Sequence, residues 1–207
     1  MYMKKLIFLR SFNILYLVPS TLNITHYWPF KNDFIDVIGG ANLTVSTPTM
    51  SNDRFNKAFE AARTSNNSNF LTAPTGIYFY SQNLTATAWI KIYSCSEHGR
   101  IFDFADGPNT NNVIFLYSFS SSCKLHANIH DGVSQGAQSS LSLSPNQWYH
   151  VGATFSVNSI RLYINGNLDG SGSASTPIIV KNRTSCFIGK GNYGDPGKIL
   201  FYSNLLN

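Results

Sequence analysis

The sequence predicts an all-β protein, a two-sheet antiparallel β-sandwich, on three observations. Short apolar runs recur from residue 25 onward, and Gly, Asn, Pro and Ser separate them. No stretch has the spacing of a long amphipathic helix. The pair Asn165-Gly166 follows directly on an alternating run, and it is a strong hairpin signal because both residues tolerate positive φ. Many short strands at this spacing favour a sandwich.

The composition limits the classes of function. The chain has 207 residues, of which 43% are hydrophobic and only 12% charged, so it can bury a sizeable core and draws much of its polarity from Ser, Thr and Asn. Its net charge is +5, but Lys4, Lys5 and Arg10 account for three of the basic residues. Without them the balance is near neutral, so no nucleic-acid partner is expected.

The first 20 residues have the features of a signal peptide, with a basic start, an apolar stretch and small residues near residue 20. The chain is therefore expected to be secreted, and not an integral membrane protein unless this end is retained as an anchor. N-glycosylation sequons agree with secretion, and they lie at Asn23, Asn42, Asn66, Asn83 and Asn182. Three cysteines allow at most one internal disulfide, and the sequence leaves the pair open among Cys95, Cys123 and Cys186.

Four further runs predict strands. Run 84–92 alternates cleanly between apolar and polar residues, whereas runs 100–104 and 113–119 are apolar on both faces, as interior strands are. In run 124–130 the apolar residues share one face and the opposite, outward face carries His126, Asn128 and His130. A short helix is expected over 55–62. The serine-rich stretches 118–122 and 134–144 are expected to be loops.

The stretch 146–168 predicts a hairpin. In "WYHVGATF" every second residue from Tyr149 to Phe155 lies on one apolar face of the predicted strand. The opposite face carries Trp148 and His150. "IRLYI" continues the alternation into the Asn-Gly turn. His150 is therefore interpreted as a strand residue, with no carboxylate or second histidine assigned to it.

Five stretches together resemble laminin-G-like jelly-roll domains of the concanavalin A-like superfamily. They are "HYWPFKNDFIDVIGGANLT", "LTATAWIK", "NQWYHVGATFSVNSIRLYINGNLDGS", "SCFIGKGN" and "ILFYSNLLN", the last looking like the closing strand. The resemblance covers residues 26–207, which we take as one domain after the signal peptide. It implies a two-sheet jelly roll whose members bind glycans, extracellular proteins or calcium.

The chain departs from this family in one respect. Such domains commonly carry an acidic pair just before the last strand, where this sequence has Gly197 and Lys198. Calcium nevertheless stays a candidate cofactor, because Asp36 and the nearby Asn32 offer hard oxygen ligands. The favoured interpretation is that Asp36 shapes its loop through an Asx-type turn.

Catalysis is not expected. Glucanases of the superfamily resemble one another in an E-x-D-x-x-E strand that supplies two carboxylates, and this chain has only two glutamates, Glu60 and Glu97, neither with an acidic partner at that spacing. Asp103 and Asp106 are three residues apart and would point to opposite faces of a continued strand. A serine-hydrolase elbow is also absent.

The candidate ligand-binding residues are exposed aromatic side chains, since a flat ring covers the apolar face of a sugar. Tyr193 is the foremost candidate, followed by Trp148 and His150. For Trp89 and Trp148 a place in the core is favoured over contact with a sugar. The sequence thus predicts a secreted, non-catalytic module that recognises glycans, with calcium as a candidate cofactor for that recognition. The alternatives are a protein-interaction or matrix module without glycan affinity, a purely structural domain and, least favoured, a fragment of a carbohydrate-active hydrolase.

Overall fold

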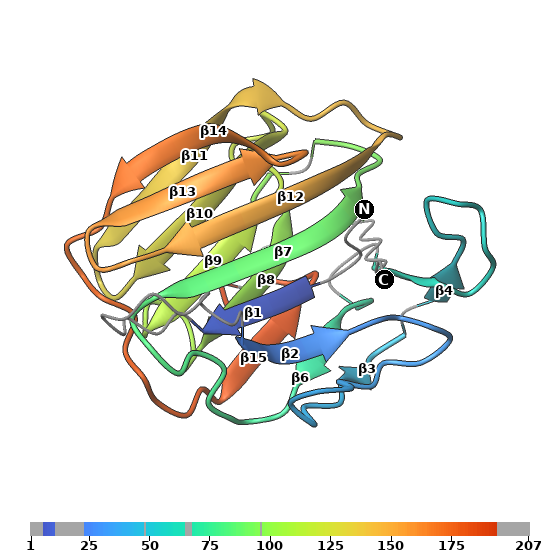
Figure 1. Ribbon diagram of the computed structural model, residues 1–207, viewed down its shortest axis with the longest axis horizontal. Helices are drawn as coiled ribbons and strands as arrows, with labels where there is room; N and C mark the ends of the chain where they lie inside the picture. Colours follow the sequence, from blue (N-terminus) through green and yellow to red (C-terminus); the bar gives the residue numbers. More distant parts are fainter. Residues whose placement is uncertain (1–5, 11–22, 48, 65–67, 96, 194–207) are drawn as a thin grey trace, which may run out of the picture.

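The protein is a sandwich of two antiparallel sheets, as predicted (Figure 1). The computed structural model describes residues 6–10, 23–47, 49–64, 68–95 and 97–193. The first sheet runs through β14 (Asn167–Ser173), β13 (Ser159–Ile164), β12 (Trp148–Phe155), β7 (Leu84–Lys91), β1 (Leu6–Arg10) and β2 (Asn23–Trp28). The second runs through β11 (Ser134–Ser142), β10 (Lys124–His130), β9 (Asn112–Leu116), β8 (Arg100–Ala105), β15 (Ser185–Ile188), β6 (Leu71–Ala73) and β3 (Thr44–Val45).

A separate hairpin joins β4 (Thr49–Ser51) to β5 (Ala61–Arg63) and extends to one side of the sandwich (Figure 1). The short helix expected over 55–62 is wrong. Asn56 and Phe59 have φ of 63° and 59°, values that a right-handed helix excludes. The side chain of Asp53 instead accepts hydrogen bonds from the backbone N–H groups of Phe55 and Lys57, which holds a turn before β5. No helix in the described part of the chain is long and apolar enough to cross a membrane.

The core lies between the two sheets and follows the predicted alternation. On β12 the apolar face from Tyr149 to Phe155 is buried, and on β10 the inward residues are buried while His126 and His130 are half-buried on the outer face. Trp28 is fully buried, and its Nε1–H donates to the carbonyl oxygen of Ala41 at 2.8 Å. Burying the indole therefore leaves no unsatisfied donor.

The Asn-Gly hairpin is confirmed. Asn165 and Gly166 have φ of 50° and 86°, the two positive values that a tight hairpin turn requires. The backbone N–H of Asn165 donates to the carbonyl oxygen of His150 at 2.7 Å, and its side-chain oxygen accepts from the N–H of His150 at 3.0 Å. The turn is thus bonded to β12 as well as to β13 and β14.

The loop expected over 134–144 is wrong for most of its length, because β11 occupies Ser134–Ser142. Its small residues have a packing role. A Cβ on Gly172 of β14 would lie 2.1 Å from the carbonyl oxygen of Gly136, and a Cβ on Gly170 would lie 2.3 Å from that of Gln138. The edge strands of the two sheets therefore meet backbone to backbone, which closes one side of the sandwich (Figure 1). The other stretch, 118–122, is a loop as expected.

The two ends of the chain bear on the predicted domain limits. Within the predicted signal peptide, β1 lies between β2 and β7 and pairs with both. The rest of residues 1–20, and the closing strand expected near residue 200, lie outside the described residues. The signal peptide stays a prediction.

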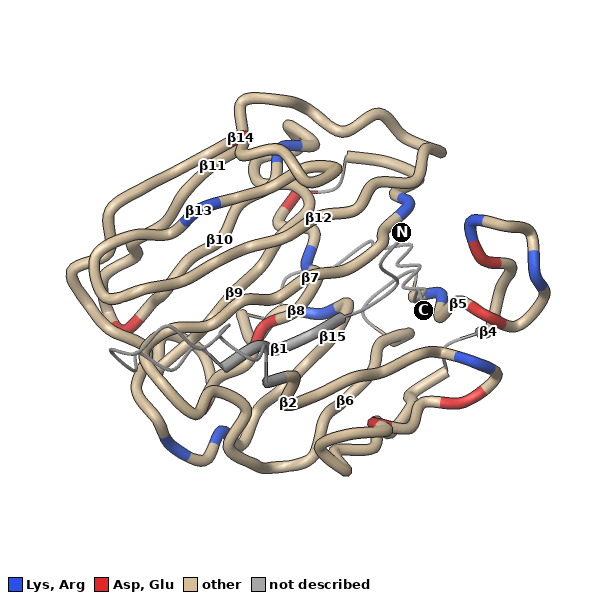
Figure 2. Tube along the Cα trace, in the orientation of Figure 1, with Lys and Arg blue, Asp and Glu red and all other residues tan. Residues whose placement is uncertain are grey.

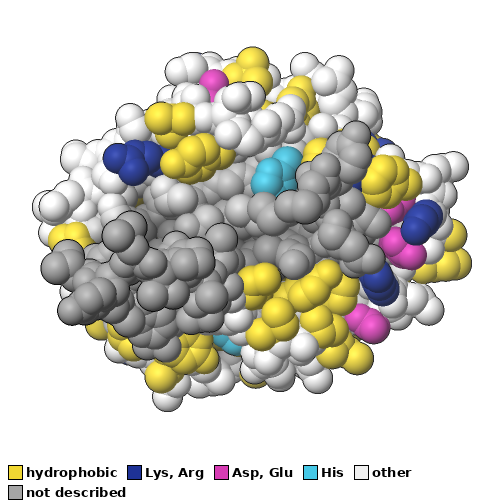
Figure 3. Space-filling model, viewed as in Figure 1, with side chains coloured by type: hydrophobic (Ala, Val, Ile, Leu, Met, Phe, Trp, Pro, Cys, Tyr) yellow, Lys and Arg dark blue, Asp and Glu magenta, His cyan; other side chains and the backbone are white. Residues whose placement is uncertain are grey.

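Charged residues are sparse on the described trace, and both signs lie mainly in loops and at strand ends (Figure 2). The outer face of the first sheet shows a histidine side chain over β12, with hydrophobic side chains gathered toward β2 (Figure 3). Neither view shows a broad surface of one charge.

Candidate functional site

The candidate site is a pocket of about 330 Å³ on the outer face of the second sheet. Its volume lies within the range of small-molecule sites. The floor is formed by outward residues of β9 and β10, and loops supply the walls; the lining residues are His98, Arg100, Ile114, Leu116, Phe119, Asn128, His130, Ser134 and Tyr193. A wider hollow of about 600 Å³ beside β11 and β14 is lined by small, uncharged residues without an aromatic ring. The smaller pocket therefore offers more chemistry.

A β-bulge in β8 places two charged residues on the same face. Arg100 pairs with Leu116 of β9 and Phe102 pairs with Phe115, so Ile101 is the extra residue. Without this insertion, residues 100 and 103 would point to opposite faces. With it, the Arg100 Nε lies 3.6 Å from Asp103 Oδ2 on the outer side, while Ile101 and Phe102 both enter the core.

Asp103 is fully buried and holds the loop that carries Tyr193. Its Oδ1 accepts from the side-chain amides of Asn112 and Asn192, each at 2.9 Å, and its Oδ2 accepts from the backbone N–H of Asn192 at 3.0 Å. Asn192 also donates to the carbonyl oxygen of Ser185. Asp103 thus fixes the residue that precedes Tyr193, and Asp103 itself is not among the residues that line the pocket.

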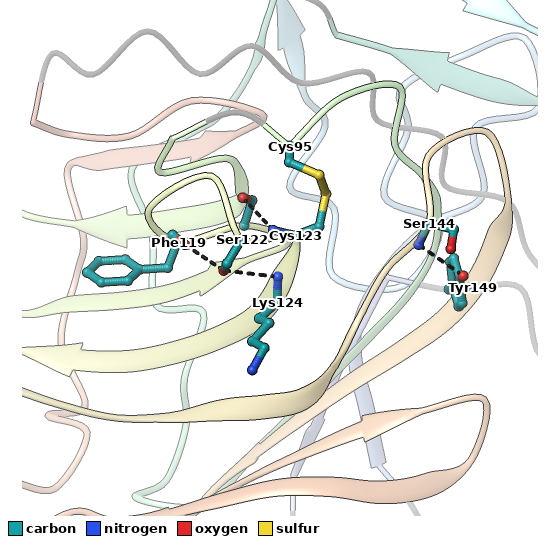
Figure 4. Close-up of a disulfide and its surroundings, with 8 residues drawn as sticks. Cys95, Phe119, Ser122, Cys123, Lys124, Ser144 and Tyr149 are labelled. Carbon is teal, nitrogen blue, oxygen red and sulfur yellow. Dashed lines mark hydrogen bonds between the residues drawn. A yellow bond between two sulfur atoms is a disulfide. The ribbon is translucent and has the colours of Figure 1, made fainter.

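A disulfide between Cys95 and Cys123 links the two loops that form the opposite wall (Figure 4). His98 lies shortly after Cys95 and Phe119 shortly before Cys123, and their ring centroids are 5.2 Å apart. Ser122 closes the second loop, because its hydroxyl donates to the carbonyl oxygen of Phe119 at 2.6 Å and accepts from the N–H of Lys124 at 3.3 Å (Figure 4). The sequence left the cysteine pairing open, and the fold decides it.

Four non-glycine residues of these loops have positive φ. His98 has φ of 51°, and Ser120, Ser121 and Cys123 have φ of 52°, 57° and 55°. Positive φ is unfavourable for residues other than glycine and persists where surrounding contacts impose it. The disulfide and the Ser122 hydrogen bonds supply such contacts here. The strain is consistent with a functional role for the loops.

Aromatic rings stand at both ends of the pocket. At one end Phe119 lies between His98 and His126, stacking on the latter with centroids 4.8 Å apart and an interplanar angle of 15°. At the other end His130 meets Tyr193 edge to face at 6.0 Å. Residues 126 and 130 share one face of β10, and four residues of strand place their Cα atoms about 13 Å apart. Asn128 lies midway between them.

Asn128 supplies the polar group of the floor. Its residue is 8% exposed, and its Oδ1 has no hydrogen-bond partner. This atom occupies the space above Gly136 of β11, where a Cβ would lie 1.7 Å from it. A side chain at position 136 would displace the amide, so the glycine is needed for Asn128 to lie across the sheet. Burial, and then the positive charge of Arg100, lower the pKa of nearby His126.

The structure separates the predicted ligand-binding residues. Tyr193 lines the pocket, whereas Trp148 and His150 lie on β12, on the outer face of the opposite sheet. The ring of His150 is 5.4 Å from that of Trp89, and burial followed by the charge of Arg54 lowers the pKa of His150. The core position considered for Trp89 and Trp148 is wrong, because both are half-buried on this outer face.

Asp36 has the geometry of a loop-shaping residue. Its Oδ1 accepts from the N–H groups of Tyr27, Ile38 and Gly39, and its Oδ2 accepts from Ala41 N–H and from His26 Nδ1 at 2.6 Å. Burial opposes ionisation of Asp36, but these hydrogen bonds outweigh it and lower its pKa to about 2. A cation would compete with five donors, so this carboxylate does not fit the predicted calcium site.

Asn32, the second predicted calcium ligand, is exposed, and its backbone N–H donates to the carbonyl oxygen of Phe59. In the described part of the chain, His, Cys, Asp and Glu form no group of three that could hold a metal. Calcium binding therefore stays a prediction without a ligand set on the described residues.

The other predicted modification sites vary in exposure. Asn42 and Asn182 are exposed and Asn83 is half-buried, whereas Asn66 and the side chain of Asn23 lie outside the described residues. Cys186 is the cysteine left unpaired; it is fully buried, and burial raises its pKa to about 12.

The comparisons with known proteins agree with the fold. The sequence model of the concanavalin A-like lectin/glucanases superfamily matches residues 64–199. The chain belongs to the concanavalin A-like lectin/glucanases superfamily. Its jelly-roll fold and its membership support a binding module in general. No curated protein matches the sequence.

Among solved structures, this chain resembles domain 4 of a GH43 extracellular arabinanase from Geobacillus stearothermophilus, determined in complex with arabinotriose. The TM-score is 0.72 at 18% identity, over 88% of this chain and 93% of that one. It also resembles the receptor binding domain of botulinum neurotoxin mosaic serotype C/D, with a TM-score of 0.53 at 16% identity. That match covers 99% of this chain and 48% of the other. At these identities the likeness shows a shared fold.

Sequence reasoning missed most of the pocket. Outward positions of His126, Asn128 and His130 were predicted, but they were interpreted as solvent-facing. Phe119 sits in a stretch expected to be a loop, and no sequence signal placed it against His98. The two cysteines flanking these loops are the signal that could have linked them, had their pairing been known.

Proposed function

We propose that this protein is an extracellular, non-catalytic module that binds a saccharide in the pocket on the second sheet. The carrying observation is the arrangement of aromatic rings at both ends of the pocket around the amide of Asn128. Aromatic faces cover the apolar faces of sugar rings, and amides exchange hydrogen bonds with hydroxyl groups. The similar arabinanase domain, determined in complex with arabinotriose, adds support from the same fold.

The available carboxylates support a non-catalytic role. Glycoside hydrolysis commonly needs two carboxyl groups across the scissile bond. None of the residues that line the pocket is an Asp or Glu. Asp103, behind it, is occupied by Asn112 and Asn192, and Asp106 binds Lys181 at 2.5 Å. Because both carboxylates are engaged by these contacts, the described part of this face offers no pair of carboxyl groups for hydrolysis.

Secretion is supported by three independent features. The Cys95–Cys123 disulfide is typical of an oxidising compartment. The described sequons include exposed Asn42 and Asn182, and the chain starts with a signal-like sequence. Extracellular glycans are therefore the saccharides that this module would meet.

A glycan array tests the proposal, with wild-type protein compared with Phe119→Ala and Tyr193→Ala. Each substitution removes one aromatic wall and should weaken binding about tenfold. Trp148→Ala is the matched control, because it removes an aromatic side chain from the opposite sheet. Binding that survives both pocket substitutions, or a blank array, would contradict the proposal.

Two additional measurements address the open alternatives. Array binding with and without EDTA tests calcium, since loss of binding with EDTA would show that a cation takes part. Mass spectrometry of each bound glycan after prolonged incubation tests hydrolysis, and any cleavage product would contradict the non-catalytic role.

A protein-interaction module is the second candidate. One observation favours it: Ile35, Val37 and Ile38 are 45%, 55% and 50% exposed around the buried Asp36. Clustered exposed apolar side chains occur at protein interfaces. A blank array, followed by binding to an extracellular-matrix fraction that Val37→Asp abolishes, would support this candidate over glycan recognition.

A further inference from the structure

The pocket gathers side chains that gain positive charge as the pH falls. Three of the five histidines of the chain lie here. His98 and His130 line the pocket, and His126 stacks on its Phe119 wall. The other two are elsewhere: His150 is on the opposite sheet, and His26 is bonded to Asp36. The concentration is specific to this face.

Of the ion pair beside the pocket, the positive residue lines the pocket and the negative residue does not. Arg100 lines it, whereas its partner Asp103 does not and is fully buried. Both carboxylate oxygens of Asp103 accept hydrogen bonds, from Asn112 and Asn192. Arg100 is also buried, at 4% exposed, and its guanidinium carbon lies 5.9 Å from the centroid of the Tyr193 ring, so of this pair the cationic member borders the pocket.

His126 and His130 of β10 face residues of the two neighbouring strands, β9 and β11. His126 pairs with Leu116 of β9 and Gln138 of β11, feels the charge of Arg100 from β8, and shares its face of β10 with Lys124. His130 pairs with Asn112 of β9 and Ser134 of β11 and contacts Tyr193.

Two further contacts complete this environment. His98 contacts Phe119, and its carbonyl oxygen accepts from Arg100 Nη1 at 2.7 Å. Asp131 follows His130 in sequence but is exposed and belongs to the lining of a different cavity. The described surroundings of the three histidines therefore contain two cations, Arg100 and Lys124, and the enclosed carboxylate of Asp103. Two exposed carboxylates are also adjacent in sequence, Glu97 before His98 and Asp131 after His130.

We propose that the pocket takes an acidic saccharide, one that carries a carboxylate or sulfate group, and that affinity rises as the pH falls through the histidine range. The inference rests on the proposed function and adds the ligand class and its regulation. A neutral imidazole offers an apolar face to the sugar, whereas a protonated imidazole attracts an anion.

The direction follows from linkage. An anion favours the protonated imidazole, so its binding raises the histidine pKa, and the reciprocal effect is tighter binding at lower pH. Burial and Arg100 lower the pKa of His126, so it gains its proton later in the titration than an exposed histidine. Its stacking on Phe119 favours the protonated form, because a cation is attracted to the ring face.

The test uses matched glycan pairs: a trigalacturonide with its methyl ester, and a sulfated oligosaccharide with its desulfated form. Binding of the full chain is measured at pH 7.5 and 5.5. The acidic member should bind roughly tenfold more tightly at pH 5.5, and the neutral member should change little. His98→Gln and His130→Gln should each reduce the pH effect, and His150→Gln is the control that should leave it unchanged.

A measurement on the unaltered protein guards against variants that fail to fold. At pH 5.5, raising NaCl should weaken binding of the acidic member and spare the neutral one. Equal, pH-independent binding of both members of a pair overturns the inference and leaves the proposed function standing. Absence of binding by every glycan on the array at both pH values overturns the proposed function and this inference together.

Discussion

The most direct test of how the first sheet is held together is Asp36→Asn. The substitution keeps the size of the side chain and replaces one carboxylate oxygen with an NH2 group. If the amide oxygen keeps the bonds from Tyr27, Ile38 and Gly39, the NH2 group faces the donors on Ala41 and His26. Two hydrogen bonds to a charged acceptor are then lost or inverted in a buried site.

The expected destabilisation follows from these contacts. A hydrogen bond to a charged group contributes about 1.5–3 kcal/mol, and changing the imidazole tautomer can restore the bond to His26. We therefore expect the free energy of unfolding to fall by about 2–4 kcal/mol, measured by urea denaturation at pH 7. Asp131→Asn is the control, because this carboxylate is exposed and should change stability by about 0.5 kcal/mol or less.

The same variant carries a pH signature. The pKa of Asp36 falls from 3.8 to about 2 on folding, so its contribution is fully present above the unfolded value and is lost as the pH falls through about 2. This contribution amounts to about 2 kcal/mol in the wild type and should be missing from the acid limb of Asp36→Asn. A variant as stable as the wild type, with an unchanged acid limb, would refute the role assigned to Asp36.

Four other predictions follow from the structure. The double substitution Cys95→Ser with Cys123→Ser should lower the free energy of unfolding by about 3–4 kcal/mol, measured by denaturation, because the disulfide closes a loop between cysteines 28 residues apart. It should also weaken glycan binding, because the two aromatic loops lose their covalent link. Unchanged affinity would contradict the role of the disulfide in positioning the loops. Gly172→Ala should cost about 1–3 kcal/mol because its Cβ would strike β11, whereas Gly76→Ala, with 3.6 Å of clearance, should be tolerated. Cys186 should resist iodoacetamide until the protein unfolds, as mass spectrometry would show; rapid labelling of native protein would disprove its burial. Secreted protein should shift in gel mobility after enzymatic deglycosylation, and an unchanged band would count against the sequon prediction.

The strand pattern was predictable from the sequence because side-chain alternation is a local property. Run 84–92, the outward positions of β10 and the Asn-Gly hairpin were all assigned from spacing and turn chemistry, and the structure confirms them. The serine-rich strand β11 was missed because its small residues lack an apolar signal. They are required by the approach of β14, a contact between distant parts of the chain.

Residue type misled the sequence reasoning in one place and left two roles open in another. The stretch 55–62 has helix-forming residues, but turn hydrogen bonds to Asp53 and the pairing of β5 with β4 override that local preference. Asp36 has the chemistry of a calcium ligand, and only its surroundings show that N–H donors occupy both oxygens.

The sequence by itself determined the sandwich, its alternating faces and the aromatic candidate Tyr193, because periodicity and turn residues act over a few positions. The tertiary structure alone decided which face of the sandwich carries the candidate pocket. It joined Cys95 to Cys123, brought His98 against Phe119, and separated Tyr193 from Trp148. The bulge at Ile101 shows the physical reason: one extra residue turns Arg100 and Asp103 to the same face, and only pairing with β9 reveals it.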